Sequence, residues 1–212
     1  MLRGLASFPP ELPGFDTGSA PADPVALFLR WLAEAIEEQV VGPHAMTLAT
    51  ADGTGRVSSR VLICKDVDAE GRWYFASSAD SPKGGDLAGN PRAALSFYWA
   101  PLGRQIRIRG TAVPAGDEAS AADFLARPPA SRAEALAGRQ SQPLDDVAEL
   151  DDALVIAQEK VAANPGLVAP AWTLYALSAD DVEFWQADHQ RRHIRLRYER
   201  TAEGWSRQLL WP

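Results

Sequence analysis

The feature that most constrains the fold is a succession of short strand-type segments joined by hairpin turns. From Arg104 to Val113, polar and apolar residues alternate strictly, which is typical of a strand with one face in a core. The turns Asp52-Gly-Thr-Gly55 and Thr201-Ala-Glu-Gly204 are rich in residues that tolerate positive φ. Segments of strand character lie at 45–50, 57–65, 72–77, 92–99, 104–113, 171–177, 182–186, 194–200 and 205–210. We therefore expect a mostly β fold, an antiparallel barrel or sheet with peripheral helices.

Two local patterns make finer predictions about these strands. The nearly continuous run of small and apolar residues at 58–65 favours a strand buried on both faces. The segment from Ser178 to Asp181 predicts a turn that separates two strands.

Helices are expected in blocks rather than between successive strands. Asp23-Pro24 provides a cap and a first-turn proline for an amphipathic helix over 24–40. Residues 83–88 predict a short helix, and 117–164 show helical patterning that is broken at Arg127-Pro128-Pro129. The proline- and glycine-rich residues 1–22 predict a flexible N-terminal arm, which leaves 23–212 as one domain.

Composition narrows the class of protein. The formal net charge of -7 argues against a nucleic-acid backbone as the main partner. The single cysteine, Cys64, can form no internal disulfide, which fits a reducing compartment. The sequence has no apolar run of about 18 residues to span a membrane and no apolar signal-peptide core near its start. We expect a cytoplasmic protein.

Several chemistries are excluded by what the sequence lacks. There is no Gly-x-Gly-x-x-Gly, no P-loop and no Gly-x-Ser-x-Gly, so Rossmann-type binding, P-loop chemistry and a serine nucleophile are unsupported. His44, His189 and His193 lack metal-ligand spacing, and we expect no metal. The basic run from His189 to Arg197 could bind RNA, but a small anionic ligand beside Trp185 fits the acidic chain better.

Cations frame the strand pair between residues 56 and 83. Arg60 and Lys65 lie on the first strand, and Lys83 closes a serine-rich loop that includes Ser81. Fixed positive charge beside hydroxyl and backbone donors is what a phosphate group needs. From these residues alone, a surface hairpin with solvated charges is an equal alternative.

A set of motifs carries a resemblance to a known family. Taken in order they are RVLICK at 60–65, SPKG at 81–84, NPRAALSFYW at 90–99, RQIRIRG at 104–110, ARPPAS at 126–131, RQSQ at 139–142, and EFWQ followed by RRHIR within 183–195. Together they resemble the pyridoxamine 5'-phosphate oxidase family, from about residue 23 to Pro212.

The resemblance implies a homodimer of FMN-binding split β-barrels with the flavin at the subunit interface. It implies that FMN is held by side chains or backbone of Arg60, Val61, Leu62, Ile63, Cys64, Lys65, Phe75, Ala76, Ser81, Lys83, Gln105, Gln140, Ser141, Trp185 and Arg195, some of them from the partner. A hydride would pass from the substrate to the flavin, and O2 would reoxidise the flavin with formation of hydrogen peroxide.

The same resemblance assigns the substrate residues. For a phosphorylated B6 vitamer, pyridoxamine or pyridoxine 5'-phosphate, it implies Lys65, Arg127 and Ser131 at the phosphate, and Arg191 and His193 over the pyridine ring. The latter two are the candidate catalytic residues.

Three positions depart from the family pattern. Asp123 stands where a phosphate-binding tyrosine is expected, Pro82 replaces one cation of an Arg-Lys pair, and Ile194 replaces an acidic residue. The 77–83 loop and GRQSQPLDD at 138–146 look more like the flavin oxidases of phenazine biosynthesis, which oxidise a reduced tricyclic carboxylic acid. A flavin-binding protein without catalysis is a third alternative.

Overall fold

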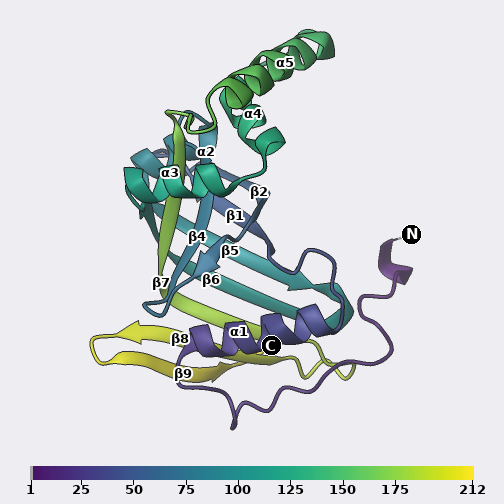
Figure 1. The fold of residues 1–212 in the computed structure, drawn as a ribbon. Helices are drawn as coiled ribbons and strands as arrows, with labels where there is room; N and C mark the ends of the chain where they lie inside the picture. The colour runs from purple at the N-terminus through teal and green to yellow at the C-terminus, as the bar shows by residue number, and fades with distance from the viewer. Residues whose placement is uncertain (1) are drawn as a thin grey trace.

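The computed structural model describes residues 2–212. They form one curled antiparallel sheet, with strands of different lengths and helices around it (Figure 1). The α-helices are α1 (Pro24–Glu37), α2 (Pro82–Gly89), α3 (Asp117–Ala126), α4 (Pro129–Ala137) and α5 (Val147–Ala163). Short 3-10 helices lie at Leu2–Gly4 and Ala100–Leu102. The strands are β1 (Ala45–Ala51), β2 (Val57–Ile63), β3 (Asp66–Val67), β4 (Arg72–Ser78), β5 (Arg92–Trp99), β6 (Arg104–Pro114), β7 (Trp172–Gln186), β8 (Ile194–Thr201) and β9 (Gly204–Leu210).

The strand order explains the curled shape. The main path runs β2-β1-β5-β6-β7-β4-β3, and a β8-β9 hairpin is added at β7. The first half of β7 pairs with β4 and its second half pairs with β8, while β6 runs along its other edge. The mostly β split-barrel architecture expected from the sequence is confirmed.

β7 corrects one prediction. Residues 178–181 do not form a turn, because Trp172–Gln186 is one continuous strand. The register with β6 shifts between Arg109 and Gly110, so the extra residue on β7 is absorbed as a bulge. A Cβ at Gly110 would lie 2.0 Å from the carbonyl oxygen of Ser178, so only glycine allows the strands to approach this closely.

β2 corrects a second prediction. The strand was expected to be buried on both faces, but Val57 and Val61 are 77% and 67% exposed. β2 pairs with β1 alone and therefore lies at an edge of the sheet. The apolar side chains of β2 are therefore exposed on the surface of the single chain and do not belong to its core.

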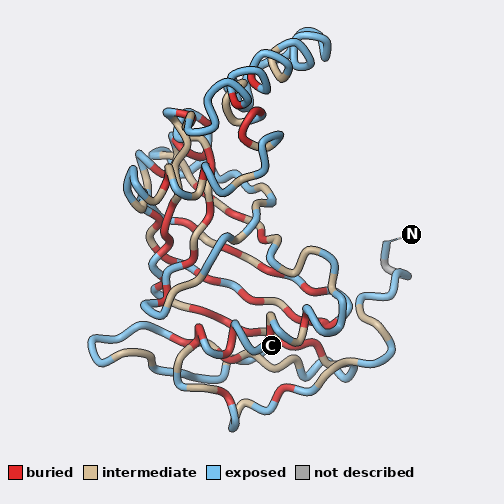
Figure 2. Tube along the Cα trace, in the orientation of Figure 1, coloured by how far each residue is buried: buried red, intermediate tan, exposed pale blue. Residues whose placement is uncertain are grey.

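The core lies between the sheet and α1, where Figure 2 shows the buried positions. Asp23 caps α1 by accepting from the backbone N–H of Val25 at 3.0 Å. Helical spacing places Phe28 and Trp31 on one face of α1. Phe28 packs on Phe97 and Trp31 on Phe184, with ring centroids 5.1 and 5.2 Å apart. The prediction of an amphipathic helix here is confirmed.

Alternation along β6 is also confirmed, since Ile106 and Ile108 are fully buried while Arg107 and Arg109 are exposed. The helical block at 117–164 becomes α3, α4 and α5, and α4 with α5 projects from one end of the sheet (Figure 1).

The N-terminal arm contacts the body of the domain. Phe15 is 7% exposed and packs edge-on against Trp31, while the Tyr198 hydroxyl donates to the Pro21 carbonyl at 2.7 Å. The flexibility of residues 1–22 and the domain boundary stay predictions. Within residues 2–212, no helix is long and apolar enough to cross a membrane.

Candidate active site

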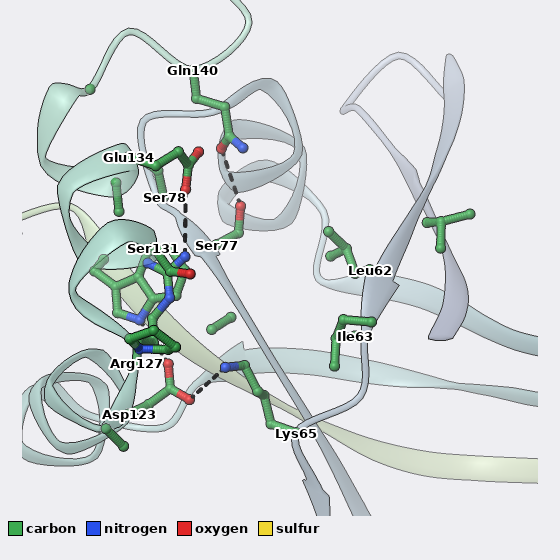
Figure 3. Close-up of a pocket in the computed structure, with 17 residues that line it drawn as sticks. Leu62, Ile63, Lys65, Ser77, Ser78, Asp123, Arg127, Ser131, Glu134 and Gln140 are labelled. Carbon is green, nitrogen blue, oxygen red and sulfur yellow. Dashed lines mark hydrogen bonds and ion pairs between the residues drawn. The ribbon is translucent and has the colours of Figure 1, made fainter. Parts of the chain in front are cut away.

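A cavity of about 540 Å³ opens between β2, β4 and the α3–α4 segment. Its volume suits a small ring-containing ligand. Residues that line it are Val61, Leu62, Ile63, Lys65, Ala76, Ser77, Ser78, Asp123, Ala126, Arg127, Pro128, Ser131, Glu134, Ala135, Gly138, Gln140 and Trp172. Figure 3 shows that the charged side chains gather at one end, where Lys65, Asp123 and Arg127 point toward one another.

Beside this cavity lies a group of side chains that we call the cradle: Arg60, Ser81, Lys83 and Gln140. Ser81 caps α2, and its hydroxyl accepts from the Gly84 N–H at 3.3 Å and from Lys83 Nζ at 3.1 Å. Lys83 Nζ also donates to Gln140 Oε1 at 3.1 Å. Burial lowers the pKa of Lys83, and nearby Arg60 lowers it further. Lys83 is only 7% exposed, and hydroxyl and amide oxygens accept hydrogen bonds from its ammonium group.

Arg60 enters the cradle from β2. Its Nη1 donates to Thr50 Oγ1 at 2.8 Å, and its Nη2 donates to the Ser58 hydroxyl. Asp86 of α2 accepts from both hydroxyls, at 2.6 Å from Thr50 and 3.2 Å from Ser58. The guanidinium is therefore oriented through hydroxyl groups, and its positive charge is not directly paired by these contacts.

The other charged group, which we call the paired end, consists of Lys65, Asp123, Arg127 and Glu134. Lys65 Nζ lies 3.3 Å from Asp123 Oδ1. Trp172 donates its Nε1–H to Asp123 Oδ2 at 2.8 Å, so both carboxylate oxygens are engaged.

Arg127 is fixed mainly by aromatic packing. Its guanidinium carbon lies 3.9 Å from the centroid of the Trp172 ring, within cation–π distance. Its Nη2 is 3.5 Å from Glu134 Oε2, and Glu134 is itself 62% exposed. Within residues 2–212, Arg127 Nη1 is buried without a hydrogen-bond partner. It is therefore an unsatisfied buried donor among the described residues. The Ser131 side chain lines the same cavity.

The structure places nine of the sequence-predicted residues on the cavity, and these are Val61, Leu62, Ile63, Lys65, Ala76, Asp123, Arg127, Ser131 and Gln140. Cys64 points elsewhere, and burial raises the pKa of its thiol to about 12. The Phe75 side chain is fully buried and stacks on Tyr175 with centroids 5.4 Å apart. Only backbone groups of Cys64 and Phe75 are therefore available to a ligand. Ser141 lies in an exposed turn with φ 67°.

The remaining predicted residues form a second group on β6, β7 and the β8 region. Gln105, Trp185 and Arg195 are direct cross-strand neighbours. His193 packs on Trp185 with centroids 4.9 Å apart, and its Nδ1 accepts from the Asp188 N–H at 3.1 Å. Arg191 follows Asp188 in an exposed turn, with φ 65°.

A single chain does not bring the two groups together. Trp172 lines the cavity at the start of β7, whereas Trp185 lies thirteen residues further along the same strand. At about 3.3 Å per residue, this separation is roughly 40 Å along the strand. One small ligand cannot reach both groups within a single chain.

Sequence reasoning missed several residues that shape these groups. Glu183 is 5% exposed and accepts from Arg195 Nε at 2.8 Å and Nη2 at 3.1 Å, and also from Arg107. Burial alone would raise the pKa of Glu183, but the hydrogen bonds from these arginines outweigh it and leave the pKa below its usual value. Trp172 was expected only as a strand residue, and nothing in its local pattern signals its contact with Asp123.

The chain matches known protein families over most of its length. Residues 32–163 match the family described as pyridoxamine 5'-phosphate oxidase. Residues 172–212 match a pyridoxine 5'-phosphate oxidase C-terminal dimerisation region. That second match contains Trp185, Arg191, His193 and Arg195, the group that a single chain leaves far from the cavity.

Relatives match over nearly the whole chain. The pyridoxine/pyridoxamine 5'-phosphate oxidase of Azotobacter vinelandii is 39% identical over 201 residues, which cover 94% of this chain and 93% of the relative. The protein of the same name from Paraburkholderia phymatum is 40% identical, with 95% of each chain covered. Among solved structures, PhzG from Burkholderia lata 383, in complex with tetrahydrophenazine-1-carboxylic acid, superposes with a TM-score of 0.88 at 32% identity. That match covers 95% of this chain and 99% of PhzG.

Fold, cavity and matches together define a flavin-dependent oxidoreductase that forms a homodimer of split barrels. The chain belongs to the pyridoxamine 5'-phosphate oxidase family.

Proposed function

We propose that this protein is an FMN-dependent oxidase that takes a hydride from a small anionic ring substrate and uses O2 as the electron acceptor. The observation that carries the proposal is the position of the cradle beside the cavity. A buried cation, Lys83, is held by neutral oxygens next to a second cation, Arg60. Such an arrangement fits the phosphate of a flavin mononucleotide.

The residues of the cradle would hold FMN by its phosphate. Arg60 and Lys83 supply positive charge, while the Ser81 hydroxyl and the start of α2 supply further donors. Gln140 and the backbone of residues 61–65 and 75–76 would contact the rest of the cofactor. When bound, FMN supplies the hydride-acceptor chemistry and passes the electrons to O2, which yields hydrogen peroxide.

The second copy of the chain would complete the site. Gln105, Trp185 and Arg195 form one cross-strand row that suits the flavin ring. Arg191 and His193 would then lie over the substrate ring and orient the carbon that loses the hydride. The exposed apolar face of β2 would be covered in the same dimer. We place the enzyme in the cytoplasm, as its single cysteine suggests.

The first candidate substrate is pyridoxine or pyridoxamine 5'-phosphate, with pyridoxal 5'-phosphate as the product. The relatives at 39% and 40% identity carry that activity in their names. Lys65, Arg127 and Ser131 all line the cavity, where they could bind the substrate phosphate.

A reduced phenazine carboxylic acid is the second candidate. Two observations favour it: Lys65 is already paired with Asp123, and the neighbouring structure of PhzG binds tetrahydrophenazine-1-carboxylic acid. A flavin-binding protein without catalysis remains as an outcome of the test.

The deciding experiment mixes the purified holoprotein with pyridoxine 5'-phosphate without oxygen and follows the flavin absorbance. Bleaching that recovers in air would support the first candidate. Bleaching only by a reduced phenazine carboxylic acid would support the second. A flavin that no donor reduces would refute the oxidase proposal.

A further inference from the structure

The paired end of the cavity has an unusual charge balance for a site that receives a phosphate. It carries two cations, Lys65 and Arg127, and two carboxylates, Asp123 and Glu134, so its formal charges cancel. Phosphate monoesters carry close to two negative charges above about pH 7, and their sites normally supply surplus positive charge.

The two carboxylates are not equivalent. Asp123 is 14% exposed, and its oxygens are engaged by Lys65 at 3.3 Å and Trp172 at 2.8 Å. Glu134 is 62% exposed and reaches Arg127 at only 3.5 Å. Water screens the exposed carboxylate, whereas the less exposed one keeps more of its field inside the cavity. Asp123 is therefore the residue that sets the charge at this end.

We infer that Asp123 is a specificity-determining residue, which makes this end of the cavity accept a singly charged carboxylate in preference to a phosphate dianion. This inference rests on the proposed function, because it takes the cavity as the substrate site, and of the two candidate substrates it favours the carboxylic acid. A bound ligand must share Lys65 with Asp123 and must tolerate the nearby carboxylate.

Charge explains the direction of this preference. Repulsion from Asp123 acts on each negative charge of the ligand, so a dianion loses about twice the free energy that a monoanion loses. Arg127 and Ser131 also line this cavity, so a bound anion can contact them there.

The test compares two unreactive ligands that share a ring system, 1-naphthoate and 1-naphthyl phosphate. Their affinities for the FMN-loaded protein are measured by isothermal titration calorimetry at pH 8, where the phosphate is a dianion. The variants are Asp123→Asn, which keeps an oxygen to accept from Trp172, and the matched control Glu134→Gln, which removes the exposed carboxylate of the same cavity. Asp123→Ser serves as a second charge-removing variant if Asp123→Asn does not fold.

In the wild type, we expect 1-naphthoate to bind at least threefold tighter than 1-naphthyl phosphate. Asp123→Asn should tighten 1-naphthyl phosphate by at least tenfold, which is about 1.4 kcal/mol. The same variant should tighten 1-naphthoate by only about threefold, because one charge gains half that free energy. Glu134→Gln should change either affinity by less than threefold.

Three results would overturn the inference. The affinities of both ligands could change equally in Asp123→Asn, or Glu134→Gln could change them as much as Asp123→Asn does. Neither ligand could bind to any variant. Failure of the proposed function is a separate result, because it is the absence of flavin reduction by any donor. The titration involves no turnover, so charge selectivity can be found or refuted even in a protein that oxidises nothing.

Discussion

The cradle and the paired end lie beside the same cavity, yet they treat their cations in opposite ways. In the cradle, Lys83 and Arg60 are held by hydroxyl and amide oxygens, and the pKa of Lys83 is lowered by burial and by Arg60. At the paired end, Lys65 and Arg127 each lie beside a carboxylate.

Within residues 2–212, the cations of the cradle have no carboxylate bound directly to them, so they can bind an anionic ligand. The cations of the paired end are already neutralised by carboxylates of the protein. Burying a cation without a carboxylate costs stability, and such an arrangement is retained where a ligand supplies the missing charge. Pairing the cation inside the protein removes that cost but also removes most of the attraction for a second anion. We therefore expect the cradle to suit a tightly held phosphate and the paired end to suit a ligand that binds and leaves.

The largest effect is expected where an unpaired cation is removed. Arg60→Ala should weaken FMN binding by more than tenfold, because a charged hydrogen bond contributes about 1.5 to 3 kcal/mol. Equilibrium dialysis followed by flavin fluorescence measures this loss. Arg56→Ala, on the exposed turn before β2, is the matched control and should retain its flavin. Full flavin retention by Arg60→Ala would show that Arg60 does not contribute to FMN binding.

A smaller effect, on the rate of turnover alone, is expected from a substitution in the group of residues on β6, β7 and the β8 region. Arg191→Ala should keep its FMN and lose at least tenfold in the rate of flavin reduction, since correct substrate positioning contributes at least this much. Stopped-flow absorbance measures the rate, and Arg192→Ala, at the adjacent position, is the control. Loss of the yellow colour in Arg191→Ala would mean that this residue binds the cofactor instead.

The comparison also predicts a gain of stability. Lys83→Met should stabilise the FMN-free protein by about 1 kcal/mol, because it removes a desolvated cation beside Arg60. The same variant should lose most of the increase in Tm that FMN gives to the wild type. Thermal unfolding with and without FMN measures both quantities. A destabilised FMN-free Lys83→Met protein would contradict the contrast between the two regions.

The smallest effect concerns Glu183, a buried carboxylate paired with Arg195 and Arg107. Its pKa is lower in the folded protein than in the unfolded chain, so its stabilisation is present above the unfolded value. This stabilisation is lost as pH falls through the lowered folded pKa, below about pH 4.3. The Tm of Glu183→Gln should therefore fall less steeply with acid than that of the wild type, by about 2 to 4 °C. If the curves of Tm against pH for the wild type and Glu183→Gln run parallel, Glu183 does not titrate in this range.

Local pattern predicted which face of a strand enters the core. The alternation from Arg104 to Val113 correctly placed Ile106 and Ile108 in the core. The turn predicted at 178–181 was wrong, because pairing of β7 with β6 across the bulge opposite Gly110 overrides the polar character of that segment. The burial predicted for 58–65 was wrong because an apolar edge strand and a core strand look alike in sequence.

For the candidate site, the sequence predicted many of the residues but not the contacts between them. Motif resemblance identified nine residues that line one cavity, and it marked Asp123 as a departure. No local signal could reveal that Asp123 pairs with Lys65, 58 positions away, or that Trp172 holds it in place. Such contacts depend on the register of β7 against β4, which is a property of the whole sheet.

The length of β7 has a consequence for mixed populations of subunits. If each active site draws Arg127 from one chain and Arg191 from the other, two different defective proteins can repair each other. Coexpressed Arg127→Ala and Arg191→Ala chains would form mixed dimers in which one site receives both defects and the other receives none. Random assortment would then restore about one site in four. In such a dimer, each active site would depend on two copies of the chain, because one strand separates its two ends by many residues.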